Sequence, residues 1–189
     1  MSGKLTIITG PMFSGKTTEL LRLYDRKNIA EVPCLLVKYR GDNRYSENNV
    51  SSHVSMHECG LSAPAVSAGT IAELFSGTYD IVNYDTIFID EIQFFPDKDQ
   101  IHHLLTLGID VVVSGLNGDW QRKMFPGMSD LFSTAYDIRM LQSICGFCKS
   151  EDACYTCRIS ASTDTIQIGG HDMYRASCLS CYLKHTKEP

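Results

Sequence analysis

The sequence predicts an α/β fold, in which helices cover both faces of a parallel sheet and a small cysteine-rich region follows. Short strand-like runs alternate with helical segments, and runs such as 86–89 and 109–115 are mostly apolar rather than alternating in polarity. Strands that are buried on both faces have this character, and in parallel sheets helices provide the cover. From about Ser143 cysteines and small polar residues dominate, so we expect two domains, 1–142 and 143–189.

Each expected element has a local signal in the chain. Strands are expected where β-branched and apolar residues cluster between turns, and helices where apolar residues recur among charges. The expected strands are 5–9, 34–39, 86–89, 109–115 and, in the cysteine-rich region, 165–168. The expected helices are 19–28, 71–75 and 99–107. The stretch 40–57 is rich in Asn and Ser, which predicts a mobile loop.

Composition limits the class of protein. The chain has 189 residues, 43% of them apolar, which suits one globular domain with a small appendage. Its net charge of −5 lacks the basic surplus with which proteins bind nucleic acid. No apolar run approaches the ~20 residues of a membrane helix, and the first apolar segment is too short for a secretion signal. We therefore expect a cytoplasmic protein that binds neither nucleic acid nor a membrane.

A phosphate-binding loop is predicted at the end of the first strand. Gly10, Gly15, Lys16 and Thr17 have the spacing Gly-x-x-x-x-Gly-Lys-Thr between an expected strand and an expected helix. Such a loop turns backbone N–H groups toward phosphate oxygens, and the following helix directs its positive dipole end at the same anion. The lysine reaches the terminal phosphates, and the threonine hydroxyl ligates Mg²⁺. A chance glycine-rich turn is the alternative, and the flanking strand and helix argue against it.

An acidic pair follows the expected strand 86–89. Asp90 comes directly after it and Glu91 comes next. In proteins with this loop an aspartate here holds the magnesium ion of ATP. We expect the parallel sheet to be of the RecA-like P-loop type. The next glutamate positions water in an ATPase, or takes a proton from the attacking hydroxyl in a small-molecule kinase. The alternative is a solvated acidic pair at the end of a strand, and the presence of the phosphate loop in the same chain argues against it. The residues expected to bind ATP and Mg²⁺ are Gly10, Pro11, Met12, Phe13, Ser14, Gly15, Lys16, Thr17, Thr18 and Asp90.

Six of the eight cysteines form three Cys-x-x-Cys pairs between residues 145 and 181. In a reducing compartment this pattern favours metal over disulfides. Cys145, Cys148, Cys178 and Cys181 form two pairs with 29 residues between them, which suits structural zinc with four thiolates. The region has few apolar residues, so zinc would supply stability that burial does not.

The third pair, Cys154 and Cys157, leaves alternatives open. It could replace one of the other pairs or consist of free thiols, and His171 and His185 lie nearby in sequence. A redox-active dithiol is a further alternative, although such a motif usually begins a helix after a strand, which is not evident here. Cys34 lies in an apolar strand and is expected to be a small buried residue.

Five motifs in order resemble the thymidine kinase family that includes the cytosolic animal and poxvirus enzymes. They are 10–22 (GPMFSGKTTELLR), 42–46 (DNRYS), 90–96 (DEIQFFP), 115–123 (GLNGDWQRK) and 168–174 (IGGHDMY), and they cover essentially the whole chain. The resemblance implies transfer of the γ-phosphoryl group of ATP to the 5′-hydroxyl of thymidine or deoxyuridine. It also implies a homotetramer that is inhibited by thymidine triphosphate (dTTP).

The resemblance assigns roles to individual residues. Glu91 matches the family's catalytic base, and Arg44 matches an arginine near the reacting phosphate. The segment 165–174 resembles a lasso that grips the base through backbone groups, closed over the nucleoside by the zinc-binding domain. The residues expected at the nucleoside are Met12, Asp42, Gln93, Phe94, Leu116, Trp120, Thr156, Thr165, Gln167, Ile168, Gly169 and Tyr174. Ordinary core packing is the alternative for the apolar ones.

The chain departs from the family pattern at several positions. Trp120 stands where the family commonly has phenylalanine, and the bulkier indole is expected to narrow the base pocket. Asp119 replaces a threonine, and Ile92 replaces a glycine that separates Glu91 from Gln93. Asn117, Cys157 and the run 124–126 also differ from the usual residues, and none of these changes removes a catalytic group.

Other function classes fit parts of the sequence. An ATP-hydrolysing motor fits the acidic pair followed by Gln93, but the chain is short, acidic and lacks a second ATPase domain. A zinc-ribbon binding module with a decayed phosphate loop conflicts with the intact Lys16, Thr17, Asp90 and Glu91. A kinase for another nucleoside shares all the motifs, which do not rank thymidine against deoxyuridine.

Overall fold

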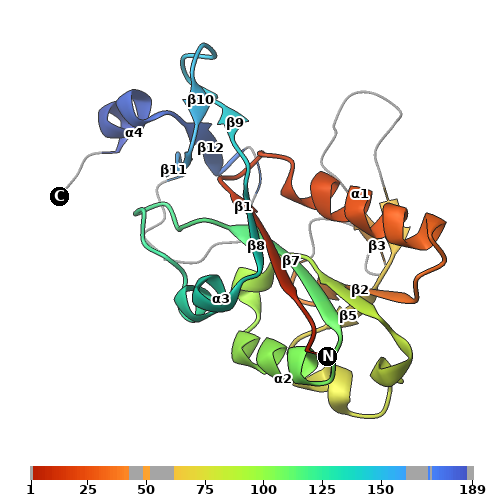
Figure 1. Cartoon of the computed structure of the whole chain (residues 1–189). Helices are drawn as coiled ribbons and strands as arrows, with labels where there is room; N and C mark the ends of the chain where they lie inside the picture. Colours follow the sequence, from red (N-terminus) through yellow and green to blue (C-terminus); the bar gives the residue numbers. More distant parts are fainter. Residues whose placement is uncertain (1, 43–48, 52–61, 161–169, 171, 187–189) are drawn as a thin grey trace.

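A six-stranded parallel sheet forms the centre of the molecule (Figure 1). The computed structural model describes residues 2–42, 49–51, 62–160, 170 and 172–186. In spatial order the strands are β5 (Val66–Ala68), β2 (Cys34–Tyr39), β6 (Thr86–Ile89), β7 (Asp110–Leu116), β1 (Leu5–Gly10) and β8 (Asp137–Met140). Every neighbouring pair is parallel. The predicted α/β fold with a parallel sheet is therefore confirmed.

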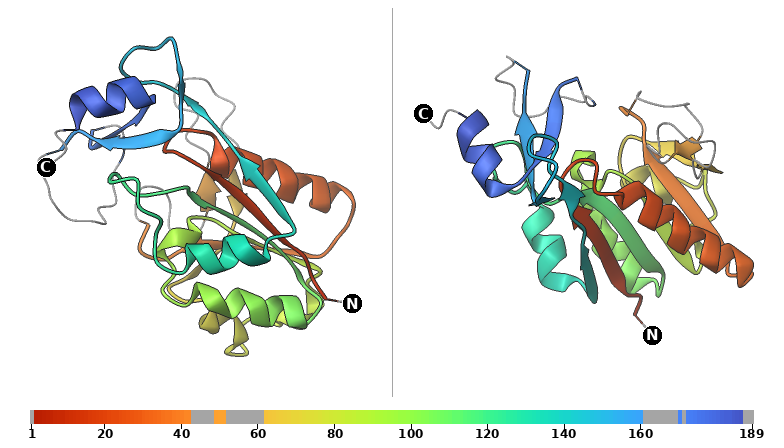
Figure 2. Two further views of the ribbon diagram at one scale, coloured as in Figure 1. Left: turned by 60° about the vertical axis from the view of Figure 1, so that its left-hand side comes forward. Right: turned by 90° about the horizontal axis from the view of Figure 1, so that it is seen from above.

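Helices cover both faces of the sheet, as Figure 2 shows from two further directions. Helix α1 (Lys16–Ile29) lies on one face, where its Leu20 and Leu21 pack with Phe88 of β6. The other face is covered by α2 (Ile101–Thr106) and α3 (Met128–Thr134). Short 3-10 helices complete the core: η1 (Ala72–Phe75), η2 (Ile81–Asn83), η3 (Ile92–Phe94) and η4 (Lys98–Gln100). Burial on both faces explains the continuously apolar strands.

The four expected sheet strands lie within one residue of their predicted bounds at each end, whereas the helices differ more. Helix α1 begins at Lys16 rather than at residue 19, because the left-handed Gly15 before it (φ 80°) starts the helix directly after the loop. The expected helix 99–107 is η4 followed by α2, and 71–75 is largely the 3-10 helix η1.

Several elements were not predicted. Helix α3 and strand β8 follow the last expected sheet strand, and β8 is an edge strand whose Ile138 and Met140 are exposed. Within the expected loop 40–57, β3 (Asn49–Ser51) pairs with β4 (Ser62–Pro64). The expected strand 165–168 lies outside the described residues.

The chain from Ser143 onward, called the cysteine lobe below, lies at the carboxyl end of β1 (Figures 1 and 2). It contains two antiparallel pairs, β9 (Ser143–Ile144) with β10 (Asp152–Ala153) and β11 (Tyr155–Arg158) with β12 (Tyr174–Ser177). Helix α4 (Leu179–His185) follows β12. The division into two domains at residue 142 stays a prediction.

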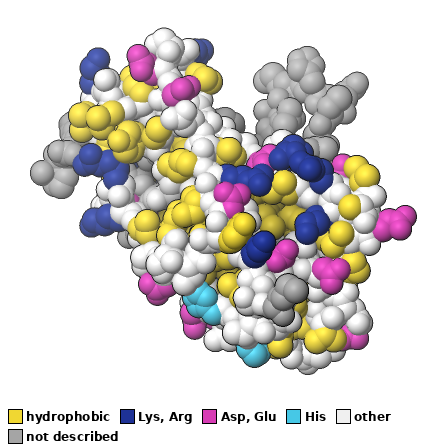
Figure 3. All heavy atoms as spheres, in the orientation of Figure 1, with side chains coloured by type: hydrophobic (Ala, Val, Ile, Leu, Met, Phe, Trp, Pro, Cys, Tyr) yellow, Lys and Arg dark blue, Asp and Glu magenta, His cyan; other side chains and the backbone are white. Residues whose placement is uncertain are grey.

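Acidic and basic side chains lie side by side on the face that carries α1 (Figure 3). Glu19 of α1 accepts hydrogen bonds from Arg22, at 2.6 Å, and from Arg139 of β8, at 2.8 Å. Arg139 also donates to Asp137 at 2.9 Å. The bond from Arg22 contributes most to holding the pKa of Glu19 below its usual value. This network ties α1 to the edge strand of the sheet.

Among the described residues, no helix combines the length and the apolar character that crossing a bilayer requires.

Candidate active site and metal centre

The phosphate loop connects the end of β1 to the start of α1 and closes on itself. Lys16 is buried, and its Nζ donates to the backbone oxygen of Pro11 at 2.7 Å. Ser14 Oγ donates to the same oxygen at 2.9 Å. The lysine is therefore held inside the turn whose backbone N–H groups, together with the N-terminus of α1, are suited to bind a phosphate.

The Thr17 hydroxyl lies beside the carboxylate of Asp90. Thr17 is in the first turn of α1, and Asp90 directly follows β6; the distances from Thr17 Oγ1 to Asp90 Oδ2 and Oδ1 are 3.1 and 3.3 Å. Ser114 of β7, the strand between β1 and β6, also donates to Asp90. Hard oxygen ligands of this kind suit Mg²⁺, which usually takes one or two carboxylates plus phosphate oxygens. The residues present therefore fit a magnesium ion bound together with a triphosphate.

Glu91 is held in an unusual backbone conformation. Its φ is 56° and its ψ is 44°, in the left-handed region that costs a residue with a side chain about 1–2 kcal/mol. Gln93 Nε2 donates to Glu91 Oε2 at 2.5 Å, and Gln93 Oε1 accepts from the backbone N–H of Leu116 at 3.1 Å. Ile92 between them is fully buried in the core. The buried isoleucine and the glutamine bridge together fix the direction of the carboxylate.

Trp120 and Tyr174 meet through Arg158. The guanidinium of Arg158, on β11, lies 4.8 Å from the Trp120 ring centroid and 5.3 Å from that of Tyr174. Arg158 Nη2 also donates to Tyr174 Oη at 2.8 Å. The hydroxyl of Tyr182 donates to the backbone oxygen of Trp120 at 2.6 Å. The loop after β7 is thus joined to β11, β12 and α4 of the cysteine lobe.

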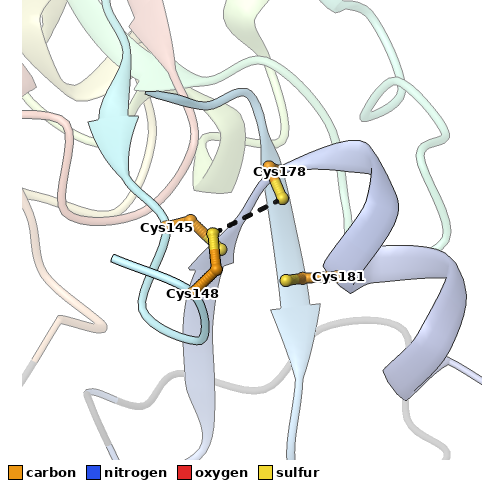
Figure 4. A group of neighbouring side chains, drawn as sticks. All are labelled: Cys145, Cys148, Cys178 and Cys181. Atoms are coloured by element: carbon orange, nitrogen blue, oxygen red, sulfur yellow. Dashed lines mark hydrogen bonds between the residues drawn. The ribbon is translucent and has the colours of Figure 1, made fainter. Parts of the chain in front are cut away.

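The four cysteines of the first and last pairs converge (Figure 4). Cys145 and Cys148 come from the turn after β9, and Cys178 and Cys181 from the start of α4. Their four Sγ atoms all lie within 4.8 Å of one another, and the Cys148 and Cys178 sulfurs are 4.0 Å apart. A tetrahedral ion with zinc–sulfur bonds of about 2.3 Å would place the sulfurs about 3.8 Å apart. The cluster therefore fits a structural zinc ion.

The pKa values of the cluster thiols differ. Burial raises the pKa of Cys145, but backbone hydrogen bonds from Cys178, Cys148 and Phe147 outweigh it and lower the value to about 6. Burial, and hydrogen bonds to its neighbours, raise the pKa of Cys181 to about 12. The pKa of Cys148 is also lowered, mainly by the hydrogen bond from the Ser150 side chain. A bound cation would favour ionisation of all four thiols.

The third Cys-x-x-Cys pair is separate from this cluster. Among the described residues, the group of converging metal-ligating side chains contains neither Cys154 nor Cys157. Cys157 is fully buried in β11, and burial raises its pKa, so it is a neutral thiol. His185 stacks on the ring of Phe147 with centroids 4.0 Å apart. His171 lies outside the described residues.

Comparison with known proteins identifies the family. The family model described as thymidine kinase matches residues 3–182. The chain belongs to the thymidine kinase family. Thymidine kinase 1 of Dictyostelium discoideum is 41% identical over 100% of this chain and 81% of its own length. The fowlpox virus thymidine kinase is 35% identical over 97% of this chain and 99% of its own, and the cytosolic thymidine kinase of Gallus gallus is 36% identical over 96% and 78%.

The structure places the family's expected site residues in three groups. Lys16, Thr17 and Asp90 form the first group, and Gln93, Glu91 and Leu116 the second. In the third, the backbone N–H of Met12 donates to Thr156 Oγ1 at 3.0 Å. Trp120 and Tyr174 belong near this last group, because Arg158 on the same strand as Thr156 contacts both rings.

The remaining predicted residues are less closely tied to these groups. The ring of Phe94 lies 5.7 Å from that of Tyr39, and the backbone N–H of the buried Asp42 donates to Tyr39 at 3.1 Å. Thr18 lies in the first turn of α1. The other predicted residues lie outside the described part of the chain: Arg44, Thr165, Gln167, Ile168 and Gly169.

Two residues that lie beside the predicted ones, Ser114 and Arg158, were not predicted from the sequence. Ser114 is a hydroxyl in an otherwise apolar strand next to the acidic pair, and Arg158 lies two residues after Thr156 in a strand. Residues two apart in a strand share a face, so the position of Arg158 on the Thr156 side was open to prediction. Its contacts with the two rings depend on the tertiary fold.

Proposed function

We propose that this protein catalyses transfer of the γ-phosphoryl group of ATP to the 5′-hydroxyl of thymidine, giving thymidine monophosphate and ADP, with deoxyuridine as a second substrate. The reaction returns free nucleosides to the supply for DNA synthesis. Family membership supports the substrate, and the three groups of side chains support the division of labour below.

ATP is proposed to bind in the phosphate loop. Residues 10–18 supply backbone N–H groups and the positive end of α1, and Lys16 exchanges its bond to Pro11 for the β- and γ-phosphates. Thr17 and Asp90 hold the Mg²⁺, which neutralises charge on the phosphates. In phosphoryl transfer, positioning and charge neutralisation account for most of the rate.

Glu91 is proposed as the base that accepts the proton of the attacking 5′-hydroxyl. Its carboxylate is directed by Gln93, whose other amide atom is bonded to the backbone of Leu116. A base on such a fixed support needs little reorganisation before reaction. Arg44 is proposed to lie near the reacting phosphate, as its counterpart does in the family.

The thymine base is proposed to bind between residues of both parts of the chain. Met12, Asp42, Gln93, Phe94, Leu116, Trp120, Thr156 and Tyr174 are the proposed contacts, with Thr165, Gln167, Ile168 and Gly169 gripping the base through their backbones. A flat apolar slot with a few polar groups suits a pyrimidine. Contact with the 5-methyl group gives only about 1–3 kcal/mol of selectivity, so deoxyuridine remains a substrate.

The proposal also covers the bound metal, the oligomeric state and the location of the protein in the cell. Cys145, Cys148, Cys178 and Cys181 bind one structural zinc ion. We infer a homotetramer and inhibition by dTTP from the resemblance to the family, and a cytosolic location from the name of the Gallus gallus relative.

One observation carries the catalytic proposal: the Thr17 hydroxyl lies 3.1 Å from Asp90, so the phosphate loop and the carboxylates after β6 are at one site. The test is a phosphorylation assay with ATP and Mg²⁺ across the four deoxynucleosides and deoxyuridine. Thymidine-dependent ADP release, with no release stimulated by nucleic acid, is the expected result. Release that depends on nucleic acid instead would reassign the protein to the ATP-hydrolysing motors.

A further inference from the structure

Two adjacent residues of the phosphate loop are bonded to the cysteine lobe. The backbone N–H of Met12 donates to Thr156 Oγ1 of β11 at 3.0 Å, and Ser143 Oγ of β9 donates to the backbone oxygen of Phe13 at 3.1 Å. The loop is thus held by hydroxyls from two different strands of the lobe. Neither bond lies within the sheet, and both orient the loop backbone.

The Phe13 ring connects the loop to the cysteine cluster itself. It is half-buried and packs against the small apolar group formed by Cys145, Ala153, Ala176 and Cys178. Two residues of that group are predicted zinc ligands. The middle of the phosphate loop therefore packs directly against residues of the proposed metal site.

The backbone conformation of Phe13 requires stabilising contacts of this kind. Its φ is 64°, in the left-handed region that glycine adopts freely and other residues avoid. A loop with phenylalanine in this conformation is strained unless contacts of the side chain offset the strain. The packing of the ring on the cluster and the bond from Ser143 are two such contacts.

The start of the loop is held by the chain that leads into the lobe. Leu141 donates its N–H to Thr9 at 2.7 Å, and a Cβ on Gly10 would lie only 2.4 Å from the Leu141 oxygen. The side chain of Asn117 donates to the backbone oxygen of Cys154 at 3.0 Å, and its N–H donates to Gly10 at 3.2 Å. The β1 end of the path to Phe13 is therefore linked to the lobe through Leu141 and Asn117, whereas the Phe13 end contacts the lobe directly.

We propose that Phe13 and Ser143 are positioning residues, through which the four-cysteine cluster holds the phosphate loop in the conformation that receives ATP. The inference rests on the proposed binding of ATP by this loop. According to this proposal, the cysteine cluster supports the ATP-binding loop as well as the residues that bind the nucleoside. Loss of either residue is expected to weaken ATP binding more than thymidine binding.

The test compares Phe13→Ala and Ser143→Ala with the wild-type holoprotein. Three quantities are measured: the Kd of a fluorescent ATP analogue with Mg²⁺, the KM values for ATP and thymidine, and zinc per chain. We expect the Kd and the ATP KM to rise about 3- to 10-fold, the change that loss of one such contact gives. The thymidine KM should stay within about two-fold and the zinc content at the wild-type value.

Conservative and control variants distinguish positioning of the phosphate loop from a general destabilisation of the cysteine lobe. Phe13→Tyr keeps a ring on the cluster and Ser143→Thr keeps the hydroxyl, so both are expected to restore ATP binding. Phe147 packs on the same cluster from within the lobe and stacks on His185. Phe147→Ala therefore removes a comparable ring from the cluster without altering the phosphate loop, and its ATP KM is expected to match wild type.

Three results would overturn the inference: an unchanged Kd in both alanine variants, equal increases in Phe13→Ala and Phe147→Ala, or a joint rise of both KM values with loss of zinc. The proposed function fails separately. A wild-type protein that binds the ATP analogue but phosphorylates no nucleoside refutes the function, while the binding arm still tests the positioning role.

Discussion

The sheet core and the cysteine lobe are stabilised by different means. In the described part of the core, strands and helices bury twenty apolar residues on one face of the sheet alone. In the lobe, the buried cluster has four members, Cys145, Ala153, Ala176 and Cys178, of which two are cysteines. Several aliphatic side chains of the lobe lie at its surface, such as Ile144, which is 62% exposed, and Leu183, which is 49% exposed, although the rings of Tyr174 and Tyr182 are buried. Burial can therefore stabilise the core, whereas we expect the lobe to depend on metal binding by its four converging cysteines.

The residues proposed for catalysis and those proposed for base binding are divided between these two parts of the chain. The groups proposed to act on phosphate and proton, Lys16, Asp90 and Glu91, lie on or directly after core elements. Thr156 and Tyr174, proposed for the base, lie on strands of the lobe. The site lies where a part stabilised by burial meets a part that we expect to be stabilised by metal, and the following predictions test that contrast.

The largest expected effect is that of zinc removal. We expect about one zinc per chain, and a zinc-selective chelator should remove on the order of 10 kcal/mol of stabilisation from the lobe. Hydrogen exchange should then show loss of protection in β9 to α4 while β1, β6 and β7 stay protected. If the protein is isolated without zinc and its lobe amides are still protected from hydrogen exchange, the lobe does not depend on metal for its stability.

A core substitution should act by loss of burial alone. Phe88 of β6 is fully buried and meets Tyr24 edge to face, with centroids 5.4 Å apart. Phe88→Ala is expected to lower the free energy of unfolding by about 3–5 kcal/mol in urea denaturation. Val82 is 72% exposed, so Val82→Ala should change it by less than about 0.5 kcal/mol. Equal effects of the two variants would show that burial does not stabilise this part.

Glu91→Gln should separate catalysis from stability. The amide can still accept the bond from Gln93, but it cannot take a proton, so kcat should fall at least ~100-fold, or about 2.7 kcal/mol. Binding of ATP and thymidine, followed by titration calorimetry, and the urea midpoint should stay near the wild-type values. Retained turnover would remove Glu91 from its role as base.

The smallest expected effect concerns the ion pairs between α1 and β8. The pKa of Glu19 is lowered in the folded protein, so its pairing stabilises the fold above the unfolded value of about 4.3. That contribution disappears as the pH falls through the lower folded pKa. Glu19→Gln is therefore expected to cost about 0.2–1 kcal/mol at pH 7 and nothing in strong acid, as thermal unfolding at a series of pH values can measure. A cost that persists in acid would point to packing rather than charge.

The sequence predicted the core better than the lobe, for physical reasons. Buried strands such as 86–89 have a strong local signal, and the phosphate loop has a fixed spacing around Lys16. Edge strand β8 was missed because its apolar residues Ile138 and Met140 are exposed. Strand β11 and helix α4 were missed because they are short and lie in a region that we expect zinc to stabilise, so they need little apolar periodicity. The convergence of two cysteine pairs was predictable from spacing, whereas the seat of Phe13 on that cluster exists only in the tertiary fold.

Trp120 gives the protein a built-in optical reporter. It is the chain's single tryptophan, and it sits under the Arg158 guanidinium at the junction of core and lobe. Its indole Nε1 is buried and, among the described residues, has no hydrogen-bond partner. Because Trp120 is one of the proposed base contacts, we expect its fluorescence to report both nucleoside binding and loosening of the lobe, without a dye or a mutation.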